Sequence, residues 1–270
     1  MKRLSGKLAL ITGASSGIGR SCARRFAEEG ADLVLWARRT DRLEALADEI
    51  RAASRVSVLV AGVDVRDRAA VGRQAQALIA DGRVPDILVN NAGLAAGLAR
   101  LHEGEFDDWD RMIDTNVRGL LNVSRAFLPA MVARGTGHVI NIGSTAGHQV
   151  YPKGNVYNAT KFAVKALTEG MNLDVAGTAV KVSSVDPGHV ETEFATVRFG
   201  GDGERAREVY RGFRPLSPDD VADVVTYVAA LPPHVNILDV VVLPTAQRNV
   251  YVIDREEGTG KREEGKGGQR

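Results

Sequence analysis

Short, uninterrupted apolar segments alternate with segments of helical periodicity along most of the chain. The apolar segments fall at residues 8–11, 33–37, 56–61, 87–90, 139–142, 180–185 and 238–243, and the helical ones at 17–29, 41–53, 67–80, 106–132, 156–176 and 219–230. A strand that is apolar on both sides must be covered on both faces, which is typical of a parallel sheet whose strands are connected by helices. Because such crossovers are right-handed, the pattern predicts a doubly wound α/β fold.

We therefore expect one Rossmann-like parallel sheet of about seven strands, with helices on both faces. No internal repeat or linker interrupts residues 1–254, so we assign them to a single domain. Residues 255–270 consist of charged residues, glycine and a few other polar residues, without a large apolar side chain. Such a segment buries too little surface to offset the entropy of ordering, so we expect a disordered polar tail.

The balance of charges and the single cysteine exclude several classes of protein. Lys plus Arg is 35 and Asp plus Glu is 34, so the net charge of +1 gives no general attraction to nucleic acid or to acidic membranes. Cys22 is the only cysteine and cannot form an internal disulfide, which suits a reducing compartment. No stretch of about 18 apolar residues could span a membrane. We expect a cytoplasmic protein whose partner is a small molecule.

A glycine-rich turn lies between the first apolar segment and the first helical one. It contains Gly13, Ser15, Ser16, Gly17, Ile18 and Gly19. Glycines permit a tight turn and close approach of a ligand, and the following helix offers free N–H groups to a phosphate. The alternative is a glycine turn without a ligand, but its place after the first strand favours a dinucleotide pyrophosphate. The sequence lacks the Gly-Lys-Ser/Thr of a nucleoside triphosphate loop.

Two arginines indicate which dinucleotide the domain 1–254 would bind. About 20 residues beyond the glycines, an NAD-binding chain usually places an acid on the ribose 2′-hydroxyl. This chain has Arg38 and Arg39 there instead. Guanidinium groups bind phosphate through paired hydrogen bonds, so we expect NADP as the cofactor. The alternative is that both arginines are solvated residues at the start of a helix.

Further motifs follow in a characteristic order, namely Asn90-Asn91-Ala92-Gly93, Asn116, Ser144, Tyr157 with Lys161, and Pro187-Gly188. With the glycine turn, they make the chain similar to the short-chain dehydrogenase/reductase superfamily over about residues 5–245. The resemblance implies an oxidoreductase whose catalytic residues are Asn116, Ser144, Tyr157 and Lys161. In that family, Lys161 also binds the nicotinamide ribose and Asn116 belongs to a water-linked proton relay.

The chemistry of these side chains is consistent with that assignment. Tyr157 and Lys161 are four residues apart, so on a helix they share one face. A phenol titrates near pH 10, but a neighbouring ammonium stabilises the phenolate and lowers its pKa. We expect Tyr157 to act as the acid/base and to contact both substrate and cofactor. Ser144 follows a strand and would polarise the substrate oxygen.

The resemblance also implies further cofactor contacts, at Asp64, Val65, Asn91, Pro187, Gly188, Val190 and Thr192. For Asp64, an equally strong alternative is the cap of the helix that follows it. The five histidines, His102, His138, His148, His189 and His234, show no ligand spacing, so no metal site is expected.

One branch of the superfamily is more similar than others, namely the NADP-dependent 3-hydroxy acid dehydrogenases, also described as serine or allo-threonine dehydrogenases. The similarity lies in residues 112–116, 141–147, 154–157, 193–194, 197–199, 234–237 and 243–245, and the chain departs from the branch at 148–150 and at Lys153. The branch implies interconversion of a small 3-hydroxy acid, such as serine, allo-threonine or 3-hydroxyisobutyrate, with its 3-oxo acid or semialdehyde.

Such a substrate carries a carboxylate that needs a cationic partner. Our hypothesis is Arg198, with Lys153 as the second choice and an exposed, uninvolved Arg198 as the alternative. A carbonyl reductase for uncharged ketones or aldehydes is the alternative function. A nucleotide-binding regulatory protein without turnover is disfavoured, because binding alone does not require a tuned phenol. The family resemblance implies a homo-oligomer, either a dimer or a tetramer.

Overall fold

The strands form a single parallel sheet in the computed structural model, which describes residues 2–256. They are β1 (Leu8–Thr12), β2 (Asp32–Ala37), β3 (Val58–Gly62), β4 (Ile87–Asn90), β5 (Thr136–Ile142), β6 (Ala179–Pro187) and β7 (Asp239–Val242). Their order across the sheet is β3-β2-β1-β4-β5-β6-β7, and every pairing is parallel. The order reverses direction between β1 and β4, where open α/β sheets place their ligands. The predicted seven-stranded, doubly wound sheet is confirmed.

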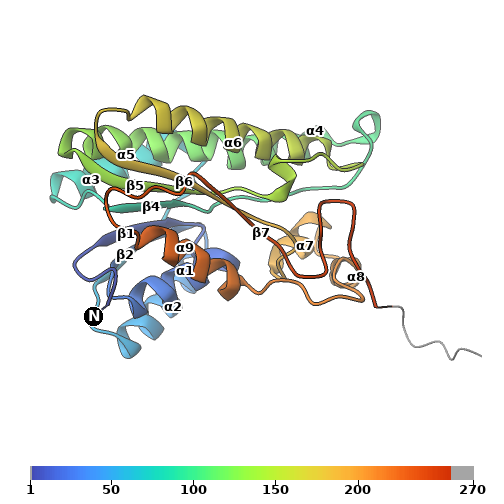
Figure 1. Cartoon of the computed structure of the whole chain (residues 1–270), viewed down its shortest axis with the longest axis horizontal. Coiled ribbons are helices and arrows are strands. Elements are labelled where there is room, and N and C mark those ends of the chain that lie inside the picture. Colours follow the sequence, from blue (N-terminus) through green and yellow to red (C-terminus); the bar gives the residue numbers. More distant parts are fainter. Residues whose placement is uncertain (1, 257–270) are drawn as a thin grey trace, which may run out of the picture.

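Helices cover both faces of this sheet, as Figure 1 shows. On one side lie α1 (Gly17–Glu28), α2 (Thr40–Ala53) and α9 (Pro218–Ala229); on the other lie α3 (Arg68–Ala80), α4 (Phe106–Ile113), α5 (Leu120–Arg134) and α6 (Asn155–Asp174). Two short helices, α7 (Glu193–Arg198) and α8 (Gly203–Glu208), lie beyond one end of the sheet. They follow β6, so they lie at the end where the parallel strands finish.

Each face of the sheet has its own hydrophobic core. Successive residues of a strand point to opposite faces, so Leu10 and Ile11 enter different cores although both are fully buried. On the α5 and α6 side, Trp36 and Phe127 pack with their ring centroids 5.6 Å apart. Burial on both faces explains why the strand segments are uniformly apolar in the sequence.

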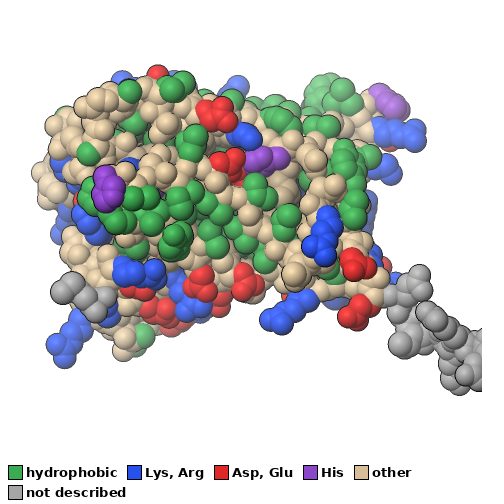
Figure 2. Space-filling model, in the orientation of Figure 1, with side chains coloured by type: hydrophobic (Ala, Val, Ile, Leu, Met, Phe, Trp, Pro, Cys, Tyr) green, Lys and Arg blue, Asp and Glu red, His purple; other side chains and the backbone are tan. Residues whose placement is uncertain are grey.

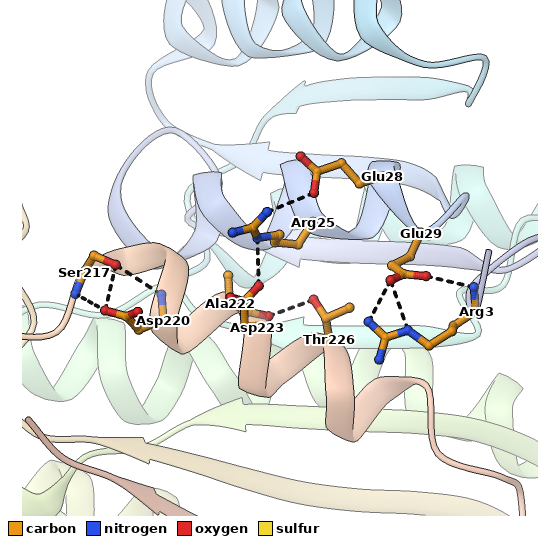
Figure 3. Close-up of polar contacts among 9 residues, drawn as sticks. All are labelled: Arg3, Arg25, Glu28, Glu29, Ser217, Asp220, Ala222, Asp223 and Thr226. Atoms are coloured by element: carbon orange, nitrogen blue, oxygen red, sulfur yellow. Dashed lines mark hydrogen bonds and ion pairs between the residues drawn. The ribbon is translucent and has the colours of Figure 1, made fainter. Parts of the chain in front are cut away.

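Helices α1 and α9, which are far apart in the sequence, lie side by side and share polar contacts at their surface (Figure 3). Arg25 on α1 lies 2.8 Å from Asp223 on α9 and 3.1 Å from Glu28. The start of α9 is fixed by Ser217 and Asp220, each of which accepts a hydrogen bond from the other's backbone N–H. Exposed ion pairs of this kind contribute at most about 1 kcal/mol each, so the apolar core holds the two helices together.

Several local details differ from the sequence-based expectation. The predicted helix over 106–132 is divided into α4 and α5 by a wider π-helical turn at Asp114–Gly119. The two short helices after β6 were not predicted. Arg255 and Glu256 contact residues 209–213, while residues 257–270 of the predicted tail lie outside the described residues, so the domain boundary stays a prediction. Within residues 2–256, no helix has the length and apolar character needed to cross a membrane.

Candidate active site

The glycine turn joins β1 to α1 and is held in an open conformation. Gly13 and Gly17 have φ values of +66° and +53°, which side chains disfavour. A Cβ on Gly19 would lie 2.4 Å from Asn91 Nδ2 and 2.6 Å from the Gly13 carbonyl oxygen. The turn therefore tolerates no side chain at Gly19, and its backbone faces a cavity.

Asn91 supports this turn from the end of β4. Its side-chain amide donates hydrogen bonds to the carbonyl oxygens of Thr12, at 2.9 Å, and Gly13, at 3.3 Å. The Thr12 hydroxyl in turn accepts from the backbone N–H groups of Asn91 and Ala92, both at 3.0 Å. Asn91 was predicted as a cofactor contact; in the structure it lines the cavity and also braces the turn.

One continuous cavity connects most of the predicted site residues. It runs from Arg38 and Arg39, past the glycine turn, to Tyr157 and Lys161. Its lining includes the predicted residues Gly13, Ser15, Ser16, Gly17, Ile18, Asp64, Val65, Asn91, Ser144, Pro187, Gly188, Val190 and Thr192. Gly19, Asn116 and Arg198 do not line it. Motifs that are far apart in the sequence therefore line a single groove at the carboxyl ends of the strands.

The basic end of the cavity is organised by Arg39. Its guanidinium donates to the Ser16 hydroxyl at 2.8 Å and to the Ser15 hydroxyl at 3.3–3.4 Å. It also forms an ion pair with Glu193 at 3.0 Å. Arg38 lines the same end of the cavity and is exposed. These two guanidinium groups and two hydroxyls form a donor set suited to a phosphate.

Tyr157 and Lys161 lie one helical turn apart on α6, and both are buried. Burial raises the pKa of the Tyr157 phenol, while the Arg198 guanidinium and a hydrogen bond with Ser144 act in the opposite direction. Burial lowers the pKa of Lys161 to about 8. The Lys161 ammonium donates to the carbonyl oxygen of Ile142, the last residue of β5, at 2.8 Å.

Asn116 lies in the π-helical turn and is buried. Its side chain exchanges two 2.8 Å hydrogen bonds with the backbone of Leu94 and donates to the Thr160 hydroxyl at 3.0 Å. Thr160 immediately precedes Lys161, so Asn116 ties the segment after β4 to the part of α6 that carries Lys161. Its expected part in a proton relay stays a prediction.

Arg198 and Lys153 were the two candidates for binding a substrate carboxylate, and the structure places them differently. The Arg198 guanidinium lies over the Tyr157 ring, 5.0 Å from its centroid, and donates to the Tyr151 hydroxyl at 2.5 Å. Its Nε is buried without a hydrogen-bond partner among the described residues. Lys153 is exposed, in a turn with φ +66°. Arg198 therefore places a positive charge beside the Tyr157 phenol, and its Nε–H group is a donor without a partner among residues 2–256.

The alternative role suggested for Asp64 is wrong. Helix α3 is capped by Asp67, whose carboxylate accepts from Ala69 and Ala70 N–H groups. Asp64 instead accepts from Arg66, which lowers the pKa of its carboxyl group. Asp64 lines the cavity beside Val65, in agreement with its predicted place.

A partly buried polar network behind the site was not predicted from the sequence. His148 Nε2 lies 2.6 Å from Asp186 Oδ2, and the Ser184 hydroxyl donates to Asp186 Oδ1 at 2.6 Å. Burial, followed by the nearby Asp239, raises the pKa of Asp186 to about 6. His148, Asp186 and Asp239 each offer an atom that could bind a metal ion, and these atoms lie within 4.8 Å of one another. The Lys165 ammonium contacts His148 at 3.1 Å and Asp239 at 3.6 Å, so this cluster already has a positively charged partner.

This network lies directly against the catalytic segment. A Cβ on Gly143, next to Ser144, would approach Asp186 Oδ1 to 1.7 Å. Asp186 also raises the pKa of Lys161, opposing the effect of burial. Its members come from distant parts of the chain, so no local spacing could have revealed them.

The parallel sheet, the glycine turn and the Ser144, Tyr157 and Lys161 cluster define a Rossmann-like α/β protein with its site at the carboxyl ends of the strands. The family model for short chain dehydrogenases matches residues 7–200. The chain belongs to the short chain dehydrogenase family, as its motifs predicted.

Individual relatives resemble the chain over most of its length. An NADP-dependent 3-hydroxy acid dehydrogenase YdfG from Salmonella typhi is 47% identical over 241 residues, which is 89% of this chain and 96% of the relative. Sulfoacetaldehyde reductase 2 from Chromohalobacter salexigens is 44% identical, covering 92% of this chain and 99% of the relative. The closed form of serine dehydrogenase complexed with NADP+ matches with a TM-score of 0.85 and 44% identity, covering 89% of this chain and 96% of that structure.

Proposed function

We propose that the protein is an NADP-dependent oxidoreductase that interconverts the 3-hydroxyl group of a small 3-hydroxy acid with the corresponding 3-oxo acid or semialdehyde. The observation that carries the proposal is the Arg198 guanidinium, which lies half-buried against the Tyr157 ring at the edge of the cavity. Its buried Nε has no hydrogen-bond partner within residues 2–256. A cation beside the acid/base suits a substrate whose hydroxyl lies a few bonds from an acid. The names of the similar proteins refer to small acids of this kind, with a sulfonate in place of the carboxylate in sulfoacetaldehyde.

The residues present fit the cofactor. The glycine turn offers backbone N–H groups at the start of α1 to a pyrophosphate, and Arg38 and Arg39 offer donors to a 2′-phosphate. Asp64 and Val65 line the cavity and would contact the adenine. Asn91, Lys161, Pro187, Gly188, Val190 and Thr192 also line it and would contact the nicotinamide side. When bound, the nicotinamide ring accepts or supplies the hydride.

The protein's own groups handle the proton and the substrate oxygen. In the oxidation, the Tyr157 Oη phenolate takes the proton of the substrate hydroxyl; in the reduction, the phenol returns it. The Arg198 guanidinium favours the phenolate electrostatically, and we assign the same effect to the Lys161 ammonium. The Ser144 hydroxyl donates a hydrogen bond to the substrate oxygen and polarises it. Asn116 donates a hydrogen bond to the hydroxyl of Thr160, the residue before Lys161, and its relay of protons to Lys161 is part of this proposal.

Reduction of NADP+, followed at 340 nm, tests the substrate class. The substrates are L-serine, L-allo-threonine, 3-hydroxyisobutyrate and 3-hydroxypropionate, each beside an alcohol of the same skeleton without the carboxylate. We expect a strong preference for the acids. Equal or higher rates with the neutral alcohols would move the protein to the alternative function, a carbonyl reductase for uncharged substrates.

We also propose a cytoplasmic homo-oligomer. Cys22 is fully buried, in keeping with a thiol that takes no part in disulfides. Apolar side chains are exposed on α5 and α6, including Leu121, Phe162 and Leu173. Figure 2 shows that hydrophobic side chains also gather near the middle of another part of the surface, over α9 and β7. Light scattering after size-exclusion chromatography would distinguish a dimer or tetramer from a monomer, and a monomer would refute the proposal.

A further inference from the structure

Glu193, the first residue of α7, binds two arginines that belong to the opposite side of the cavity. Its carboxylate lies 3.0 Å from Arg39 Nη1 and 2.7 Å from Arg42 Nη1. Hydrogen bonds from Arg42 and Arg39 hold the pKa of Glu193 below its usual range. The carboxylate is thus ionised and occupies donors of Arg39, whose remaining donors reach Ser15 and Ser16.

The helix that starts at Glu193 also carries the residues that contact the catalytic tyrosine. Phe194 packs edge-on against the Tyr157 ring, with centroids 5.6 Å apart, and Arg198 lies over the same ring. Helix α7 ends in a turn where Gly200 and Gly201 have positive φ values. One short helix therefore joins the basic end of the cavity to the catalytic end.

We propose that Glu193 is a specificity-determining residue that competes with the cofactor 2′-phosphate for Arg39, and so couples phosphate binding to the attachment of α7. The inference rests on the proposed NADP dependence. A phosphate bound by Arg39 and the Ser15 and Ser16 hydroxyls lies beside the Glu193 carboxylate, and the two anions repel each other. Glu193 keeps its second partner, Arg42, which does not line the cavity. Binding of the phosphate loosens one of the two ion pairs of α7, and by reciprocity the attachment of α7 weakens phosphate binding.

The size of the effect follows from the exposure of the three side chains. Arg39, Arg42 and Glu193 are 42%, 44% and 48% exposed, so each pair lies in the weak range of surface ion pairs. Removing the charge of Glu193 should therefore tighten binding of a 2′-phosphate roughly two- to five-fold. The gain should diminish at high ionic strength, because salt screens exposed charges.

Calorimetric titration of the full chain with adenosine 2′,5′-bisphosphate and with adenosine 5′-monophosphate measures this directly. We expect Glu193→Gln to bind the bisphosphate more tightly than the wild type and the monophosphate equally well. Glu191→Gln is the matched control, because Glu191 is an exposed carboxylate two residues away, with no ion pair among the described residues. Unchanged or weaker binding of the bisphosphate by Glu193→Gln would overturn the inference and would mean that Glu193 orients Arg39 for the phosphate instead of competing with it.

Hydrogen exchange of α7 tests the coupling without relying on activity. In the wild type, the bisphosphate should speed exchange of the α7 amides and the monophosphate should not. In Glu193→Gln, exchange should already be fast and insensitive to either nucleotide. The coupling would be refuted if the bisphosphate left the exchange rate of the wild-type α7 amides unchanged. If the wild type bound both nucleotides equally, the proposed NADP dependence itself would fail. If the wild type preferred the bisphosphate and Glu193→Gln left that preference unchanged, only the inference about Glu193 would fail.

Discussion

Replacing Arg198 by methionine removes its charge while keeping an unbranched side chain of similar reach. In the structure, the guanidinium is half-buried and donates to Tyr151, and its buried Nε has no partner in the described part of the chain. If this group binds the substrate acid, the variant loses a charge-assisted hydrogen bond in a partly desolvated site. Such bonds contribute about 1.5–3 kcal/mol, which corresponds to roughly a 10- to 150-fold loss in kcat/KM for an acid substrate.

The assay must separate carboxylate binding from the effect of Arg198 on Tyr157. The Arg198 charge lowers the pKa of the phenol, so its removal slows every substrate to some extent. That effect falls chiefly on the neutral alcohol, because a bound carboxylate offsets the Arg198 charge. The values of kcat/KM for 3-hydroxypropionate and for 1-propanol are therefore compared, each measured by NADP+ reduction at 340 nm. We expect kcat/KM for the acid to fall by the roughly 10- to 150-fold range estimated for the lost bond and kcat/KM for the alcohol to fall less, so that the ratio of acid to alcohol falls. Lys153→Met, which removes an exposed cation, is the control and should leave the ratio unchanged.

Two results would refute this reasoning. If Arg198→Met lowered the rates with the acid and the alcohol by the same factor, Arg198 would act only through Tyr157. If Lys153→Met reduced the ratio and Arg198→Met did not, the carboxylate would bind at the exposed turn. In either case the assignment of Tyr157 as acid/base would stand.

Three further predictions test other parts of the site and fold. Tyr157→Phe should reduce turnover by roughly 100- to 10,000-fold, the usual contribution of an acid/base, while the Kd for NADPH measured by fluorescence changes little; retained turnover would contradict the assignment. Gly19→Ala should destabilise the glycine turn by about 1–3 kcal/mol in urea unfolding, because its Cβ would lie 2.4 Å from Asn91 Nδ2; wild-type stability would contradict the crowding. Burial lowers the pKa of His138 from 6.5 to about 3. As pH falls, His138 is therefore protonated in the unfolded chain before it is protonated in the folded chain. As pH falls from 6.5 toward 3, the wild type should lose up to about 1.36 kcal/mol of unfolding free energy per pH unit through this group, and His138→Gln should lack that component.

The sheet was predictable because its determinants are local. Each strand is a short apolar segment bounded by polar residues, and the β4 bounds of Ile87–Asn90 agree with the prediction. The π-helical turn at Asn116 was not predictable, because the sequence around it is compatible with an ordinary helix. Its side chain bonds Leu94 and Thr160, which are 22 and 44 residues away, and these tertiary contacts accompany the local geometry.

The candidate site also contains residues that could be predicted from the sequence and others that could not. Ser144, Tyr157 and Lys161 could be named because their spacing is a motif, and the structure brings them to one cavity. The partners that tune them could not be named. Tyr151 and Arg198 are 47 residues apart, and His148 and Asp186 are 38 residues apart, so only the packed chain shows that they touch.

In the proposed function, Arg198 would link substrate charge to proton transfer, because its guanidinium lies over the Tyr157 ring and would bind the carboxylate. It lowers the pKa of the Tyr157 phenol while no anion is bound to it, against the strong opposing effect of burial. A carboxylate that binds Arg198 neutralises much of that charge, so an acid substrate weakens the stabilisation of the phenolate that a neutral substrate leaves intact. The remaining positive charge near the phenol is then that of Lys161, which Asp186 helps to keep protonated although burial lowers its pKa to about 8. Asp186, whose carboxylate lies behind Gly143, would thereby support the Lys161 charge on which proton transfer from an acid substrate would depend.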